Sequence, residues 1–199
     1  RLTFEDAHIE ASKIAHILVE RYGIQVGDRV AISMRNYPEW ILTFMAVTSI
    51  GGVAVAMNSL WKPEEMSYGL TDSGAKLLIA DEERIERFNE IEEKLDIAII
   101  SVRAVKEHPY ASLEALLEKA IDRDMPEQRP LPESDATIMY TSGSTGHPKG
   151  VVSCHVNIIH ALLGWELEQQ CALALLDEPP PDPPDSPATL LAVPLFHAT

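Results

Sequence analysis

The chain has little positive charge, few cysteines and no long apolar run. Its 199 residues include 16 Lys and Arg against 31 Asp and Glu, a formal net charge of −15 at pH 7. Nucleic acids and anionic membranes are bound through clusters of cations, so this balance argues against both as partners. No apolar run reaches 18 residues and no signal peptide is recognisable, which argues against a membrane span.

Cys154 and Cys171 are the only cysteines, and neither belongs to a Cys-x-x-Cys pair. A structural zinc site and a thiol redox motif are therefore not expected, and the metal-ligand prediction for this chain is none. Both thiols are predicted to be reduced and half-buried in a cytoplasmic protein.

Segments with helical and with strand periodicity alternate along the sequence. Such alternation requires crossover connections and predicts an α/β fold with a doubly wound, largely parallel sheet flanked by helices. The apolar character of the strands agrees, because parallel sheets are covered on both faces. Helices are predicted over residues 3–22, 36–50, 63–74, 82–94, 112–120 and 155–170, and strands over 29–34, 53–57, 76–80, 97–100, 136–140, 151–153 and 189–197.

The predicted organisation has three parts. Residues 1–121 form a first α/β subdomain, residues 122–134 a surface linker, and residues 135–199 a segment that contains the motif described below. Residues 177–187 hold six prolines and no lysine or arginine, a composition that predicts an exposed insertion. The tryptophans Trp40 and Trp61 are predicted to pack in the core, and the charged stretch 82–94 to be a solvated helix face.

The most informative motif is YTSGSTGHPKGV at residues 140–151, directly after an apolar strand-like run. Its glycines let backbone N–H groups turn toward an anion, and its hydroxyls add further donors. Lys149 adds a mobile positive charge. This chemistry predicts a loop that holds a polyphosphate. The predicted phosphate-binding residues are Thr141, Ser142, Gly143, Ser144, Thr145, Gly146 and Lys149.

A P-loop, Gly-x-x-x-x-Gly-Lys-Ser/Thr, is the obvious alternative. The distance from Gly143 to Lys149 fits that motif, but Pro148 stands where the second glycine belongs and Gly150 where the Mg²⁺-binding hydroxyl belongs. Proline has no N–H to offer a phosphate. The residues that follow favour a strand and not a helix, which argues for a phosphate loop of another design.

The motif resembles the signature loop of the adenylate-forming superfamily, which includes acyl-CoA synthetases, coumarate-type CoA ligases, luciferases and the adenylation domains of peptide synthetases. Weaker similarities at residues 2–4, 27–30, 51–53 and 72–75 extend the resemblance over nearly the whole chain, to the N-terminal half of an acyl-CoA synthetase-like large domain. The chain begins at Arg1 without methionine and ends directly after an apolar run, so we expect a fragment of a longer enzyme.

The resemblance implies an activity for this parent enzyme: ATP-dependent activation of a fatty or aryl carboxylic acid to acyl-AMP, followed by transfer to CoA. ATP, Mg²⁺ and CoA are implied, with the Mg²⁺ ligand mostly outside this chain. The PLFH segment at 194–197 resembles a motif that reaches the acid pocket, so His197 is expected near the substrate. The family's adenylation lysine lies later in the chain, and no catalytic residue is predicted within these 199 residues.

Two alternatives stay open. The chain alone is interpreted as either an inactive fragment or a non-catalytic nucleotide-binding or structural α/β module. The parent is alternatively an amino-acid-adenylating domain, although those relatives usually carry Phe-Asp where this chain has Phe196-His197. That aspartate pairs with the substrate ammonium group, so its absence favours an acid without an α-amine.

Overall fold

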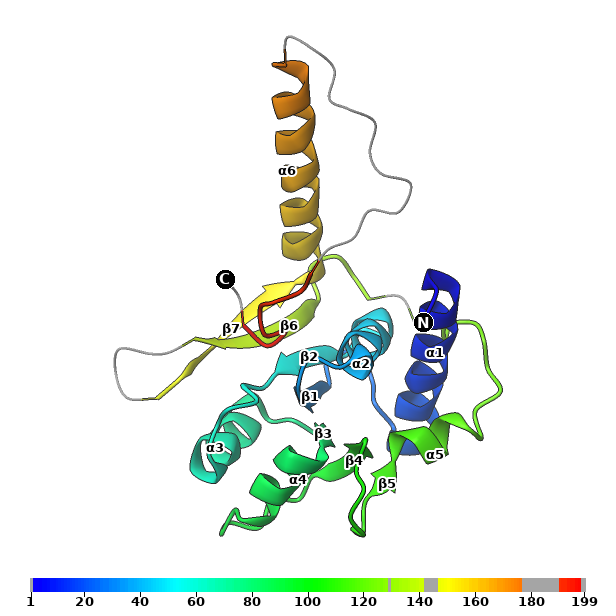
Figure 1. Cartoon of the computed structure of the whole chain (residues 1–199), viewed down its shortest axis with the longest axis vertical. Coiled ribbons are helices and arrows are strands. Elements are labelled where there is room, and N and C mark those ends of the chain that lie inside the picture. Colours follow the sequence, from blue (N-terminus) through cyan, green and yellow to red (C-terminus); the bar gives the residue numbers. More distant parts are fainter. Residues whose placement is uncertain (1, 129, 142–146, 177–189, 198–199) are drawn as a thin grey trace.

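The computed structural model describes residues 2–128, 130–141, 147–176 and 190–197. Helices and strands alternate through most of this range (Figure 1). The elements are α1 (Phe4–His16), the π-helical turn η1 (Ile17–Arg21), β1 (Arg29–Ser33), α2 (Pro38–Ser49), β2 (Val53–Ala56), α3 (Pro63–Ser73), β3 (Leu77–Asp81), α4 (Glu82–Asn89), β4 (Ala98–Val102), β5 (Ala111–Ser112), α5 (Leu113–Leu117), β6 (Asp135–Thr141), β7 (Lys149–Cys154) and α6 (His155–Ala174).

The seven strands form one sheet in the order β5-β4-β3-β1-β2-β6-β7. All neighbouring pairs are parallel except β6 and β7, which form an antiparallel hairpin at one edge. The prediction of a largely parallel sheet is confirmed. From β1 the chain moves first to β2 on one side and then to β3 on the other, so the strand order reverses between β1 and β3. The carboxyl ends of the parallel strands share one edge of the sheet.

Two apolar layers cover the sheet because side chains alternate along each strand. In β3, Leu77 and Ile79 belong to the cluster that contains the buried residues of α1 and α2, whereas Leu78 and Ala80 belong to the cluster beneath α3 and α4 (Figure 1). Trp40 and Trp61 are both buried, as predicted, one in each cluster. Helices on both faces make the sheet doubly wound.

Local contacts and backbone angles define the ends of the first two helices. The Thr3 hydroxyl accepts from the Asp6 N–H at 3.0 Å, and the Asp6 carboxylate accepts from the Thr3 N–H, so a capping box begins α1. Gly23 has a φ of +63°, a left-handed conformation that glycine adopts readily at the end of a helix. The second helix begins at Pro38 with Tyr37 at its N-cap, two residues later than predicted.

The predicted and observed elements differ in several places. Helix α5 ends at Leu117 and not at residue 120, and α6 continues past residue 170 to Ala174. The helix expected over 82–94 ends at Asn89. Its last turn tightens there, because the Glu90 and Ile91 N–H groups donate to the Arg87 and Phe88 carbonyl oxygens, three residues back. Residues 190–197 form no strand, and β5 was not predicted. Cys154 is half-buried as expected, whereas Cys171 is exposed.

The hairpin and α6 complete the described chain. The predicted strand after the motif is β7, and the predicted helix from His155 is α6. Residues 122–128 and 130–134 contain no helix or strand, while residues 177–187 lie outside the described residues. The division into parts at 121 and 134 stays a prediction. Within the described ranges, the helices are too short or too polar to cross a membrane, and the cytoplasmic location also stays a prediction.

Candidate functional site

The candidate phosphate loop joins the two strands of the β6–β7 hairpin. Thr141 ends β6 and is paired with Lys149, the first residue of β7. Both are exposed, and the Thr141 hydroxyl lies 3.5 Å from the Lys149 carbonyl oxygen. Residues 142–146, which include five of the seven predicted phosphate-binding residues, lie outside the described residues. The hairpin therefore fixes the two ends of the loop at the carboxyl end of β6.

Lys149 has no ion-pair partner among the described residues. An exposed ammonium at the mouth of a loop rich in glycine and hydroxyl groups suits a polyphosphate, because the ligand would supply the missing counter-charge. The donor set that the sequence gives this loop fits the phosphates of ATP. The described residues contain no group of three metal-ligating side chains.

Helix α3 contacts the tip of the hairpin at both ends of the loop. The Tyr140 hydroxyl lies 2.7 Å from Asp72 Oδ2 and 3.2 Å from the Gly69 carbonyl oxygen. The Tyr140 ring meets the Trp61 ring edge-on at 5.2 Å. On the other side of the loop, the His147 ring stacks on Tyr68 at 4.9 Å. Sequence reasoning took Tyr140 only as the first letter of the motif and missed these contacts.

His197 lies in the segment 190–197, which docks at the carboxyl end of β1. The Asn36 amide donates to the Val193 carbonyl oxygen at 2.8 Å and accepts from the Leu195 N–H at 2.9 Å. Phe196 is buried, whereas His197 is exposed. The segment is held by a side-chain clamp and not by strand pairing, which explains why the predicted strand is absent. The substrate-pocket role of His197 stays a prediction.

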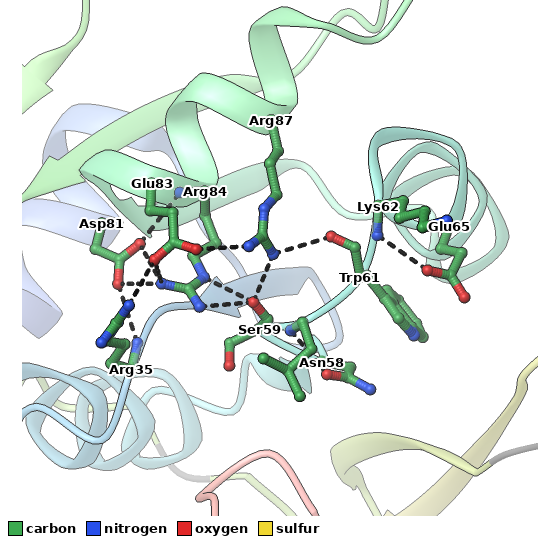
Figure 2. Close-up of polar contacts among 11 residues, drawn as sticks. Arg35, Asn58, Ser59, Trp61, Lys62, Glu65, Asp81, Glu83, Arg84 and Arg87 are labelled. Carbon is green, nitrogen blue, oxygen red and sulfur yellow. Dashed lines mark hydrogen bonds and ion pairs between the residues drawn. The ribbon is translucent and has the colours of Figure 1, made fainter.

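A buried network of ion pairs and hydrogen bonds joins the ends of β2 and β3 near this segment (Figure 2). The Arg84 guanidinium contacts the Asp81 carboxylate at 3.1 Å, and both residues are buried. The same guanidinium donates to the Ser59 carbonyl oxygen at 2.7 and 2.8 Å. Asp81 also accepts from the Arg35 N–H at 3.0 Å, which adds the end of β1. The interpretation of 82–94 as a solvated face was therefore wrong at Arg84, because a buried guanidinium needs these acceptors.

Glu83 extends this network with half-exposed ion pairs. It pairs with Arg35 and Arg87, at 2.9 and 2.6 Å. The hydrogen bond from Arg35 and the neighbouring guanidinium charges hold the pKa of Glu83 below its usual value, although partial burial opposes them. A hollow of about 330 Å³ lies between Glu83 and its arginine partners on one side and the Pro194–Phe196 turn on the other. It stands where the strand order reverses, at the edge where doubly wound sheets bind ligands.

The arrangement defines an α/β protein in which a hairpin, whose loop is rich in glycine and hydroxyl groups, lies on the carboxyl edge of a largely parallel sheet. The profile of the family described as AMP-binding enzyme matches residues 1–199, and the chain belongs to that family.

The chain is 31% identical over 172 residues to the long-chain-fatty-acid–CoA ligase FadD13 of Mycobacterium tuberculosis, covering 83% of this chain and 32% of that protein. It is 31% identical over 198 residues to a feruloyl-CoA synthase of Amycolatopsis sp, covering 99% and 35%. The solved anthranilate CoA ligase AuaEII in complex with anthranoyl-AMP has a TM-score of 0.76 at 25% identity, covering 83% and 32%. The chain thus spans about a third of the length of these relatives.

Proposed function

We propose that the full-length protein containing this chain activates a carboxylic acid with ATP and transfers the acyl group to the thiol of CoA. The observation that carries the proposal is the hairpin loop with its exposed Lys149 at the carboxyl edge of the sheet. It is supported by family membership and by the CoA-ligase names of its relatives.

The reaction has two steps. A carboxylate oxygen of the acid attacks the α-phosphorus of ATP, which forms acyl-AMP and releases pyrophosphate. The thiol sulfur then attacks the acyl carbonyl carbon, and AMP leaves as the thiol proton is lost. Negative charge grows on the departing pyrophosphate in the first step, and donors that are fixed in advance stabilise it. In this chain that role falls to residues 141–146 and to the ammonium of Lys149.

Acid-dependent exchange between ATP and pyrophosphate tests the proposed activity. The full-length protein is assayed with panels of fatty, aryl and amino acids. Exchange with one class establishes adenylation and names the substrate class. Silence with every acid would contradict the proposal and favour a non-catalytic nucleotide-binding module.

Lys149→Ala in the full-length protein tests the residue. We expect the adenylation rate to fall by about 100-fold, the effect typical of removing one transition-state donor. The thermal midpoint should not change, because Lys149 is exposed. Lys119→Ala, at another exposed lysine beyond α5, is the matched control and should match wild type in both measurements. An unchanged exchange rate in Lys149→Ala would remove this residue from the proposed site.

We further infer that the acid lacks an α-amine and that the 199-residue chain alone catalyses neither step. His197 offers no carboxylate to a substrate ammonium group, and the chain spans only about a third of its relatives. Fatty and aryl acids both satisfy the first inference. The same exchange assay on the isolated chain tests the second, and acyl-AMP formation by that chain would contradict it.

A further inference from the structure

The tip of the β6–β7 hairpin extends beyond the strand that supports it. Pairing between β6 and β2 ends at Met139, opposite Ala56, whereas pairing between β6 and β7 continues to Thr141. At Tyr140 and Thr141, the edge of β6 opposite β7 therefore pairs with no strand of the described chain. A two-stranded hairpin is only marginally stable by itself, so the position of the tip depends on what it touches.

Helix α3 supplies that support at both ends of the loop. Tyr68 and Asp72 are four residues apart and so lie on one face of the helix. Asp72 holds the Tyr140 hydroxyl two residues before the undescribed segment begins, and Tyr68 stacks on His147 directly after it. We call these four residues, Tyr68, Asp72, Tyr140 and His147, the α3 anchor.

Two glycines make room for the anchor. A Cβ on Gly69 would lie 2.4 Å from the Trp61 ring, so the absence of a side chain lets α3 lie against Trp61, which in turn contacts Tyr140. A Cβ on Gly150 would lie 3.3 Å from Tyr140 Cζ and 3.0 Å from Ile138. The Tyr140 ring is thus packed between α3 and β7, with its hydroxyl directed at Asp72.

The Tyr140 hydroxyl is a permanent donor in this setting. Burial, and then the hydrogen bond to the Asp72 carboxylate, raise the pKa of Tyr140 well above its usual value. The hydroxyl therefore stays protonated at any physiological pH and donates to the Asp72 carboxylate. A hydrogen bond to an ionised acceptor is stronger than one between two neutral groups.

We propose that Tyr140 is a positioning residue whose hydroxyl, held by Asp72, fixes the β6 end of the phosphate loop on α3 and thereby sets the affinity for ATP. The inference rests on the proposed function, since the loop must hold the polyphosphate for its position to matter. A loop fixed in advance loses less conformational freedom when the phosphates bind.

Tyr140→Phe in the full-length protein is the test, because it keeps the ring and removes only the hydroxyl. Tyr110→Phe is the matched control. Its hydroxyl donates to Asn89 Oδ1 at 2.6 Å, next to the opposite edge strand β5. In acid-dependent exchange we expect the KM for ATP to rise about threefold to tenfold in Tyr140→Phe, as for one lost hydrogen bond, with the KM for the acid unchanged. The control should match wild type in both.

Variants of Asp72 sharpen the assignment. Asp72→Asn keeps a carbonyl acceptor and should stay closer to wild type than Asp72→Ala, which should match Tyr140→Phe. The double variant Tyr140→Phe/Asp72→Ala should be no worse than either single variant, because both remove the same contact. An ATP KM in Tyr140→Phe equal to that of the control, or a parallel rise in the KM values of ATP and acid, overturns the positioning role.

A second readout separates this inference from the proposed function. Amide hydrogen exchange in the peptide spanning β6 and β7 should be faster in Tyr140→Phe than in Tyr110→Phe, whether or not the protein is active. If the wild-type protein adenylates no acid, the proposed function fails, and faster exchange at the hairpin still supports the anchor. Equal exchange in the two variants overturns it.

Discussion

Helices α2 and α6 are both rich in apolar residues, yet they lie in opposite surroundings. Helix α2 lies between α1 and the sheet and buries most of its apolar side chains, and its Trp40 is 6% exposed. Helix α6 extends from β7 away from the sheet, none of its residues is buried, and its Trp165 is 67% exposed (Figure 1).

The apolar content of a segment therefore predicts a helix, but it does not predict which part of the protein packs against that helix. An isolated helix is marginal in water, and most of its stability in a protein comes from packing an apolar face. Helix α2 receives that packing from α1 and β2 within this chain. Helix α6 contacts β7 and otherwise presents Ile159, Leu162, Leu163, Trp165 and Leu167 to solvent, an apolar surface of the kind that marks an interface.

Replacing each tryptophan by alanine is the sharpest test of this contrast. Trp40→Ala leaves a cavity in the core and should lower the free energy of unfolding by about 3–5 kcal/mol. Trp165→Ala removes an exposed side chain and should change it by less than about 0.5 kcal/mol. Urea denaturation of the 199-residue chain, at concentrations where it is monomeric, measures both. Equal losses would mean that α6 is covered within the monomer.

Self-association gives the second test, because an exposed apolar helix face favours association with another apolar surface. We expect the isolated 199-residue chain to associate with a second copy through this helix. Leu162 and Trp165 are three residues apart and share one face. The double variant Leu162→Glu/Trp165→Glu should therefore sediment as a monomer at concentrations where wild type associates.

Leu131→Glu is the matched control for this experiment, since Leu131 is 68% exposed outside α6. It should leave the sedimentation of the chain unchanged. A monomeric wild type, or equal association of the double variant and wild type, would contradict an α6 interface between copies.

Local signals in the sequence carried most of the fold. The alternation of helices and strands depends on patterns among neighbouring residues, and the structure confirms it. The two strands on either side of the motif were likewise predicted from their apolar runs, but their antiparallel pairing was not.

Contacts between distant residues had no such signal. Asn36 binds residues 193 and 195, 157 and 159 positions further along the chain, and only the folded sheet brings them together. Arg84 looked solvated because the Ser59 carbonyl, 25 positions earlier, becomes its acceptor only when β2 and β3 lie in one sheet. The anchoring of Tyr140 on α3 is of the same kind.

The smallest effect on stability is expected from removing an ion pair. The sheet and its covering helices contain such pairs, whereas α6 has none among the residues described. Asp28 lies before β1, is 12% exposed, and pairs with Lys76 at 2.6 Å. Its carboxylate also accepts from the Gln25 N–H at 3.0 Å. Burial raises the pKa of Asp28, but the bonds from Lys76 and Gln25 outweigh it and hold this pKa below its ordinary value of 3.8. No α6 residue forms an ion pair within the described part of the chain.

A carboxylate whose pKa is lowered by folding stabilises the protein above its unfolded pKa, and that contribution is lost as the pH falls through the folded value. Asp28→Asn should therefore cost less than about 1 kcal/mol at pH 7, because Lys76 is largely exposed. The deficit relative to wild type should shrink below about pH 4 in urea denaturation series. Asp96→Asn, at an exposed aspartate before β4, should follow wild type throughout. A deficit that is constant from pH 7 to pH 3 would mean that Asp28 acts through packing and not through its charge.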